Sequence, residues 1–145
     1  MQFDADLLET WKSSVLEIQH ICRWITLWDG ARYFPEAVPK EVEGQDLYMI
    51  TAYNPGSEAI SDEENKERDK RLFVGISKLA SASMFVSVGR SLSGSHKEFG
   101  YAVYGVAKQD VDQLAKEFGQ IGYYRFTASA MEVFALDQGG EFVKV

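Results

Sequence analysis

The sequence has 145 residues, a mass of 16.3 kDa, 46% hydrophobic residues and a formal net charge of -7. A chain of this length and apolar content is expected to fold as one domain, residues 1–145, which excludes wholesale disorder. Its 22 Asp and Glu against 15 Lys and Arg argue against nucleic acid or an anionic membrane surface as the main partner. Binding to phosphates needs a concentrated basic field, which this composition lacks.

The chain contains one cysteine, Cys22, which cannot form an intramolecular disulfide. It lies between apolar residues, so a buried and unreactive thiol is expected. The N-terminal segment is acidic where a secretory signal needs positive charge, and no apolar run reaches the roughly 20 residues of a membrane span. These features predict a cytoplasmic protein in a reducing compartment, with no membrane partner.

Residues 5–28 allow two interpretations. Apolar residues recur there at steps of three and four, which predicts one long helix. The β-branched and aromatic residues instead favour a helix that ends near residues 13–14, followed by strands at 15–18 and 21–27. The Gly- and Pro-containing segment 29–46 is expected to be a long connection over the surface.

The segment 47–53 is the best candidate for a central strand, because both of its faces are largely apolar. The sequence Asn-Pro-Gly-Ser at 54–57 ends this strand in a turn. Ser61 and Glu64 then match a capping box, in which the Glu64 side chain returns to the Ser61 backbone, and they predict a helix over residues 62–80. The buried face of this helix is expected to carry Leu72, Ile76 and Leu79.

The rest of the chain alternates between pairs of strands and one further helix. Strands are expected at 84–88, 99–106, 121–127 and 131–136, with a helix at 109–118 closed by Gly119, a turn at 137–140 and a short edge strand at 142–143. Strands in adjacent pairs predict an α+β fold. We expect a single domain with a largely antiparallel sheet of about five to seven strands and two or three helices.

Two polar residues lie on the core-facing line of the helix predicted after the turn. Stepping back from Leu72 by four and then three residues reaches Arg68 and Asn65. This line should emerge beside the end of the preceding strand, where Asn54 and Ser57 lie and where free backbone N–H groups favour an anion. Either these polar side chains hold the turn by hydrogen bonds, or they contact a polar or anionic small ligand.

The stretch Thr-Ala-Tyr-Asn-Pro-Gly-Ser at 51–57, followed by Ser61, Glu64-Asn65 and Arg68, resembles the signature of the DUF3293 family, small bacterial proteins of unknown function. A glutamate that opens a strand and the sequence Phe-Gly-Gln at 118–120 are also similar to that family. The resemblance covers about residues 47–124. It implies a ligand-binding site that contains Asn54, Ser57, Glu64, Asn65, Arg68, Glu98 and Gln120. These groups converge at one end of the sheet if the strands that begin near Glu98 and Gln120 neighbour the strand at 47–53.

Catalytic and metal-binding patterns are sparse. Only His20 and His96 could serve as the base of a Ser-His-acid site. His96 lies in a Gly/Ser-rich segment beside Glu98 and Arg90, so Glu98 or His96 is the candidate acid or base. Two distant histidines and one isolated cysteine give no metal-ligand spacing, so neither a metal nor a cofactor is expected.

Three functions follow from these observations. The first is a binding protein with a site for a polar or anionic small ligand at the strand–turn–helix 54–68. The second is an acidic inhibitor or immunity-type protein that neutralises a basic protein partner. The third is an uncharacterised enzyme that uses Glu98 or His96 as acid or base. A deep polar pocket would favour the first or the third, whereas a flat acidic patch with exposed aromatic residues would favour the second.

Overall fold

The structure is a computed structural model that describes residues 3–136 and 142–144. In this part of the chain one antiparallel sheet has the strand order β2-β1-β4-β5-β3-β6-β7-β8. The strands are β1 (Val15–His20), β2 (Arg23–Trp28), β3 (Leu47–Thr51), β4 (Ser83–Arg90), β5 (Lys97–Tyr104), β6 (Gly122–Phe126), β7 (Met131–Ala135) and β8 (Phe142–Lys144). The helices are α1 (Ala5–Lys12), α2 (Asp62–Ser77) and α3 (Lys108–Glu117).

The predicted α+β fold with an antiparallel sheet is confirmed. The expected edge strand is β8, which brings the described strands to eight. The turn expected at 137–140 lies outside the described residues. No helix among the described residues is long and apolar enough to cross a membrane.

Residues 5–28 form α1 and the β1–β2 hairpin, so the interpretation as a helix and two strands is correct. α1 ends at Lys12, whose carbonyl accepts a hydrogen bond of 2.7 Å from Nε1 of Trp28. Along β1, Leu16 and Ile18 are fully buried while Gln19 is exposed, which is the alternation of a strand. Two strands with alternate side chains in one core bury more apolar surface here than one exposed helix would.

Cys22 is exposed, so the prediction of a buried thiol is wrong. Together with Ile21 it forms the two-residue turn between β1 and β2, and both residues have positive φ, 50° for Ile21 and 62° for Cys22. Positive φ at both central residues is typical of a type I′ hairpin turn, which lies beyond the end of the sheet. Of the apolar neighbours of Cys22, Ile21 shares the exposed turn, while Trp24 and Ile25 belong to β2, so none of them buries the thiol.

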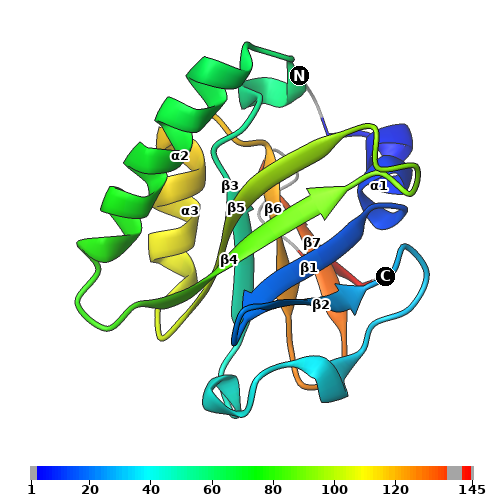
Figure 1. The fold of residues 1–145 in the computed structure, drawn as a ribbon, viewed down its shortest axis with the longest axis vertical. Helices are drawn as coiled ribbons and strands as arrows, with labels where there is room; N and C mark the ends of the chain where they lie inside the picture. The colour runs from blue at the N-terminus through cyan, green and yellow to red at the C-terminus, as the bar shows by residue number, and fades with distance from the viewer. Residues whose placement is uncertain (1–2, 137–141, 145) are drawn as a thin grey trace.

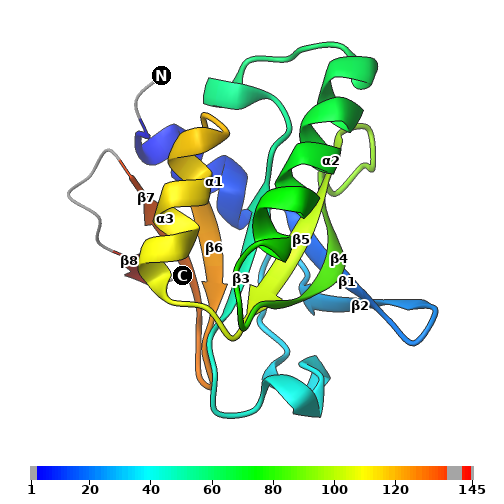
Figure 2. The ribbon, with the colours of Figure 1, turned by 90° about the vertical axis from the view of Figure 1, so that its left-hand side faces the viewer.

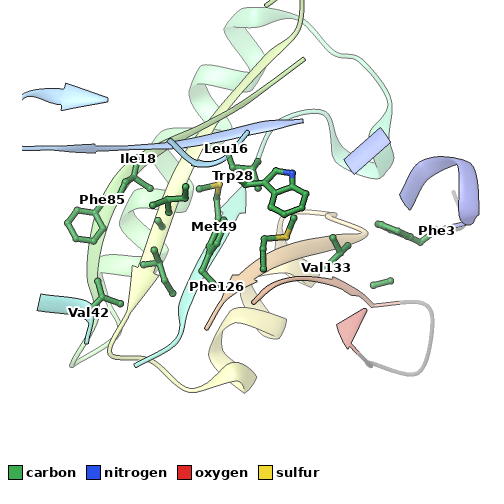
Figure 3. Packing of buried hydrophobic residues seen from close by; sticks show 14 residues of the cluster. Phe3, Leu16, Ile18, Trp28, Val42, Met49, Phe85, Phe126 and Val133 are labelled. Atoms are coloured by element: carbon green, nitrogen blue, oxygen red, sulfur yellow. The ribbon is translucent and has the colours of Figure 1, made fainter. Parts of the chain in front are cut away.

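The sheet is strongly curled, as Figures 1 and 2 show. Side chains from β1 and β2, at one end of the strand order, share a hydrophobic cluster with side chains from β6 and β7, near the other end. Figure 3 shows members of this inner core around a common centre: Leu16, Trp28, Met49, Phe126 and Val133. The curl therefore gives the sheet an inner face that is covered largely by its own strands.

The outer face is covered by α2 and α3, which lie side by side in Figure 2. β3 lies between β5 and β6 and is buried on both faces, as predicted for a central strand. α2 begins at the predicted residue and ends at Ser77, three residues before the predicted end. The outer core contains Leu72 and Ile76 of α2, Val111 and Leu114 of α3, and Tyr48, Ile50, Tyr101 and Val103 of the sheet.

Candidate functional site

A cavity of about 300 Å³ opens at one end of the curled sheet. It is lined by inner-face residues of β3, β4, β5 and β6, by α1, and by the turn between β3 and α2. Glycine occupies two of the lining positions, Gly89 on β4 and Gly122 on β6, and Gly89 is the register partner of Glu98 on β5. A Cβ at Gly122 would collide with the carbonyl oxygen of Phe134, so that position requires glycine, whereas a Cβ at Gly89 would make an ordinary contact with Leu16.

The turn after β3 is held by a pair of asparagines. Asn65 Nδ2 donates to Asn54 Oδ1 at 2.9 Å, and the Asn54 backbone N–H donates to Asn65 Oδ1, also at 2.9 Å. Asn54 has a left-handed backbone, with φ of 47°, which asparagine tolerates better than most residues. Asn54 lines the cavity, and its side-chain Nδ2 makes no hydrogen bond to any described residue. Asn65 does not line the cavity but fixes the residue that does.

Arg68 ties the end of β3 to the end of α3. Its Nε donates to the carbonyl of Ala52 at 2.7 Å, its Nη2 donates to the carbonyl of Phe118, and its guanidinium lies 5.8 Å from the centre of the Phe118 ring. Burial lowers the pKa of Arg68, and the charge of Arg71 acts in the same direction. Arg68 is absent from the cavity lining. Its contacts fit the interpretation in which the polar side chains hold the turn by hydrogen bonds.

Glu64 lies at the N-terminus of α2. Its backbone N–H donates to Ser61 Oγ at 3.1 Å, which confirms the predicted cap. The Ser61 hydroxyl in turn donates to Glu64 Oε1 at 3.0 Å. The Glu64 side chain therefore meets the Ser61 hydroxyl and not, as the capping box predicted, the Ser61 backbone N–H. Glu64 is exposed and lies outside the cavity lining.

Gln120 follows Gly119, which closes α3 with φ of 66° as predicted for the residue after a helix. Its Nε2 donates to the carbonyl of Tyr53 at 3.0 Å and to that of Phe118 at 3.3 Å. These bonds hold the side chain against the end of β3, where it lines the cavity beside Asn54. Gln120 Oε1 has no hydrogen-bond partner among the described residues and is available as an acceptor.

Glu98 brings a carboxylate to the cavity. Glu98 Oε2 lies 2.7 Å from Nε2 of His96, and both residues line the cavity. Arg90, on the neighbouring strand, lines the same cavity, and its Nε donates to Glu17 Oε1 at 2.9 Å. The charged residues of the wall are thus the His96–Glu98 pair and Arg90, whose partner Glu17 lies outside the lining.

Of the residues predicted for the site, Asn54, Ser57, Glu98 and Gln120 line one cavity, whereas Glu64, Asn65 and Arg68 do not. Helical spacing shows on which face of α2 a residue lies, but it does not show where the cavity lies. The cavity is on the opposite side of the sheet, so the prediction wrongly placed all seven residues together. The exposed Ser57 has a positive φ of 63° and no side-chain hydrogen bond to a described residue.

Ser87 is a lining residue that the sequence analysis missed. It is only 2% exposed, and its hydroxyl makes no hydrogen bond to any described residue. The sequence signal for Ser87 was its alternation with Phe85 and Gly89, which puts the three residues on one face of the strand. This signal does not show which face is the inner one, because that depends on the curl of the sheet.

An aromatic wall was also missed. Trp11 of α1 and Tyr124 of β6 line the cavity with their ring centres 5.0 Å apart, and the Tyr124 hydroxyl donates to the Trp11 carbonyl at 3.0 Å. Burial raises the pKa of Tyr124, while Ser14 acts in the opposite direction and the charge of Glu98 makes a smaller contribution that raises it. No group of three or more His, Cys, Asp or Glu residues that could hold a metal ion is found in the described ranges.

One known protein family matches a segment of the chain that contains part of this site. The family described as "Protein of unknown function (DUF3293)" matches residues 50–121. No curated protein and no solved structure matches the chain. The matched segment contains Asn54, Ser57, Glu98 and Gln120, while Trp11 and Tyr124 lie outside it. The match over residues 50–121 agrees with the DUF3293 family that the motifs indicated.

Proposed function

We propose that this chain is a small-ligand-binding protein of the bacterial cytoplasm and that its ligand occupies the cavity between α1, the turn after β3 and the β4–β5 hairpin. The observation that carries this proposal is Ser87, a residue only 2% exposed that lines the cavity and whose hydroxyl makes no hydrogen bond to a described residue. A ligand in the cavity can form a hydrogen bond with this hydroxyl, and such a bond contributes about 0.5–1.5 kcal/mol.

Two amide side chains support a polar ligand. Asn54 uses its oxygen within the turn and keeps its Nδ2 as a donor, whereas Gln120 uses its Nε2 and keeps its Oε1 as an acceptor. Each amide is held by the hydrogen bonds at its other end, so little side-chain entropy is lost when a ligand binds. The cavity volume of about 300 Å³ is at the lower end of the range for small-molecule sites.

The sequence argument for an anionic ligand rested on Arg68 and on free backbone N–H groups at the start of the helix. The Nε and Nη2 of Arg68 both donate to backbone carbonyls, and Arg90 is the arginine found in the cavity lining. The proposed site therefore moves from the outer side of the strand–turn–helix 54–68 to the inner face of the sheet. The charge of the ligand then depends on Arg90 and Glu98.

A screen of metabolites by thermal unfolding tests the proposal. Saturation at about 100 times the dissociation constant stabilises a protein by about 2.7 kcal/mol, so a true ligand raises the melting temperature measurably. In Gly89→Val the added Cβ lies 3.4 Å from Leu16 Cδ2, an ordinary contact, and the rest of the side chain occupies the cavity. We expect compounds that stabilise the wild type to have no effect on this variant.

The matched control is Ser83→Ala, because Ser83 is an exposed serine on the same strand and outside the cavity lining. It should respond to the same compounds as the wild type, while Ser87→Ala should respond less. Equal stabilisation of the wild type and Gly89→Val, with Gly89→Val shown by circular dichroism to be folded, would place binding elsewhere and refute the proposed site.

The His96–Glu98 pair favours an enzyme as a second candidate. A histidine nitrogen 2.7 Å from a carboxylate in a cavity wall has the arrangement of a general base and its orienting partner. If the protein is an enzyme, a compound from the screen should be converted by the wild type and recovered unchanged from Glu98→Gln. Recovery of the unchanged compound from the wild type favours binding alone.

Exposed aromatic residues keep the inhibitor alternative as a third candidate. Trp24 and Phe99 are 43% and 37% exposed on the outer face of the sheet, with ring centres 6.5 Å apart. Together with the net charge of -7, this face suits a basic protein partner. A basic protein that co-purifies with the wild type and with Gly89→Val, but not with Trp24→Ser, would support this function.

A further inference from the structure

We infer that the ligand is a small organic ammonium ion, with its charge at Glu98 and its apolar part against Trp11 and Tyr124. This inference rests on the proposed function and specifies the class of ligand that the same cavity takes. It combines the charge of the wall, its aromatic surface and its free hydrogen-bonding atoms.

The charge of the cavity wall favours a cation. Arg90 is paired with Glu17 at 2.9 Å, so its positive charge is neutralised within the protein. Among the described residues the ion-pair partner of Glu98 is His96, which contacts one of the two carboxylate oxygens. Glu98 Oε1 has no hydrogen-bond partner in the described part of the chain. An ammonium group supplies the missing opposite charge, whereas a carboxylate or phosphate would meet repulsion from Glu98.

The aromatic wall favours the same charge. The rings of Trp11 and Tyr124 lie beside each other in the wall, and the hydrogen bond from the Tyr124 hydroxyl to the Trp11 carbonyl holds this arrangement. Glu98 and Tyr124 line the same cavity, so one ligand can contact both the carboxylate and the ring. Organic ammonium ions are bound by aromatic rings through cation–π attraction, and their hydrocarbon part packs on the same rings.

The free hydrogen-bonding atoms are largely acceptors. A primary ammonium group has three N–H donors and no acceptor. Glu98 Oε1, Gln120 Oε1 and the hydroxyl oxygen of Ser87 line the same cavity, and none of them accepts a hydrogen bond from a described residue. Each of these acceptors can take one N–H of an ammonium group, and the hydroxyl of Ser57 is a further acceptor in the lining. Asn54 Nδ2 is a remaining donor, for an oxygen elsewhere on the ligand.

Three related probes distinguish the ligand classes by isothermal titration calorimetry at neutral pH: 2-phenylethylamine, 2-phenylethanol and phenylacetate. They share an aromatic ring and differ in the charge of the polar end. We expect the wild type to bind the amine at least about tenfold more tightly than the alcohol, because a hydrogen-bonded charge contributes about 1.5–3 kcal/mol and 1.4 kcal/mol is tenfold. Phenylacetate should bind most weakly.

Glu98→Gln is the critical variant. It should lose the preference for the amine while its affinity for the alcohol stays within about twofold, since the shape of the cavity is unchanged. Glu117→Gln is the matched control, because it removes one exposed carboxylate at the end of α3 and changes the net charge equally. Its affinities should equal those of the wild type. Trp11→Leu should weaken the binding of all three probes and keep their order.

Three outcomes overturn the ammonium inference: tightest binding of phenylacetate, equal binding of amine and alcohol, or no heat of binding with the amine at millimolar concentration. The first two would leave the proposed function intact, because a probe still enters the cavity and Gly89→Val should still block it. The third contradicts the inference, and the metabolite screen with Gly89→Val then decides the proposed function separately. An unchanged preference in Glu98→Gln would assign the charge selectivity to another group and would also refute the inference.

Discussion

Arg68 and Asn65 lie on the buried line of α2, but their side chains meet protein atoms. Asn65 is paired with Asn54, and Arg68 with the carbonyls of Ala52 and Phe118. The helical period predicted that both residues lie on the buried line of α2. It could not predict their hydrogen-bond partners, because only the tertiary fold brings the end of α3 to Arg68. These two residues hold the turn that presents Asn54 to the cavity.

Arg68→Ala should lower the free energy of unfolding by about 3 kcal/mol, because hydrogen bonds to charged groups contribute about 1.5–3 kcal/mol and the substitution removes two. Urea denaturation followed by circular dichroism measures this loss. Lys70→Ala, an exposed position on the same helix, is the control and should change stability by less than about 0.5 kcal/mol. Equal stability of Arg68→Ala and the control would show that the two hydrogen bonds have no structural role.

Asp69 is the residue whose stability effect depends on pH. Its Oδ2 accepts from the Tyr101 hydroxyl at 2.9 Å, while its buried Oδ1 has no hydrogen-bond partner in the described residues. Burial raises the pKa of Asp69, against the opposite effect of the Tyr101 hydroxyl. The folded state therefore holds the proton more tightly than the unfolded chain does. The stability contribution falls as pH rises from the ordinary value of 3.8 through the raised pKa of the folded state.

Asp69→Asn keeps the acceptor for Tyr101 and removes the charge. We expect this variant to be more stable than the wild type at neutral pH by about 1 kcal/mol, the lower range for a buried polar group without a partner. The difference should vanish as the pH approaches 3.8, where the wild-type carboxyl is protonated. Thermal unfolding of both proteins across this range measures the effect. A constant difference at all pH values would contradict an origin in the ionisation of Asp69.

At the scale of elements, the β1–β2 hairpin shows where local patterns conflict. Helical spacing and strand composition were both present in residues 5–28, and the outcome depended on the inner core that Leu16, Ile18 and Leu27 complete. The turn residues themselves are unusual for their conformation. Ile21 is 80% exposed and has positive φ although it is β-branched, a combination that costs stability.

The double variant Ile21→Asn with Cys22→Gly should stabilise the protein by about 1–2 kcal/mol, because an ordinary side chain in the left-handed region costs roughly that much. Little burial is lost, since both turn residues are exposed. The urea midpoint measures the gain. The control Ile21→Val with Cys22→Ser keeps residues that disfavour positive φ and should show no such gain. A lower midpoint for the Asn-Gly variant would mean that the turn is not strained.

At the scale of the whole molecule, the curled sheet joins two cores. The same strands contribute to the inner core and to the outer core, on alternate residues. Figure 1 and Figure 2 show that α2 and α3 cover part of the outer face, whereas α1 lies apart from them at one end of the sheet. The two cores should therefore unfold together, because loss of either one exposes the strands that support the other.

Ile18→Ala in the inner core and Leu72→Ala in the outer core should each lower the free energy of unfolding by about 3 kcal/mol, within the usual range for such truncations. Both residues are fully buried. Tryptophan fluorescence, to which Trp11, Trp24 and Trp28 contribute, and far-ultraviolet circular dichroism should give coincident transitions for both variants. Two separate transitions in either variant would contradict cooperative unfolding of the cores.

The sequence by itself determined the elements whose signals are local. Apolar residues on both faces identified β3, Ser61 identified the start of α2, and Gly119 identified the end of α3, because periods, caps and C-terminal glycines act within a few residues. The DUF3293 motifs also lie in one continuous segment, and they identified the family.

Only the tertiary structure decided that residues 5–28 contain a hairpin, that Cys22 is exposed, and which of the predicted polar residues face the cavity. Ser87 and Trp11 became part of the candidate site because the sheet curls and α1 closes one end of it. The physical reason is that alternation along a strand divides residues between two faces without saying which face will be concave. That choice depends on contacts between residues far apart in the chain, and such contacts leave no local pattern in the sequence.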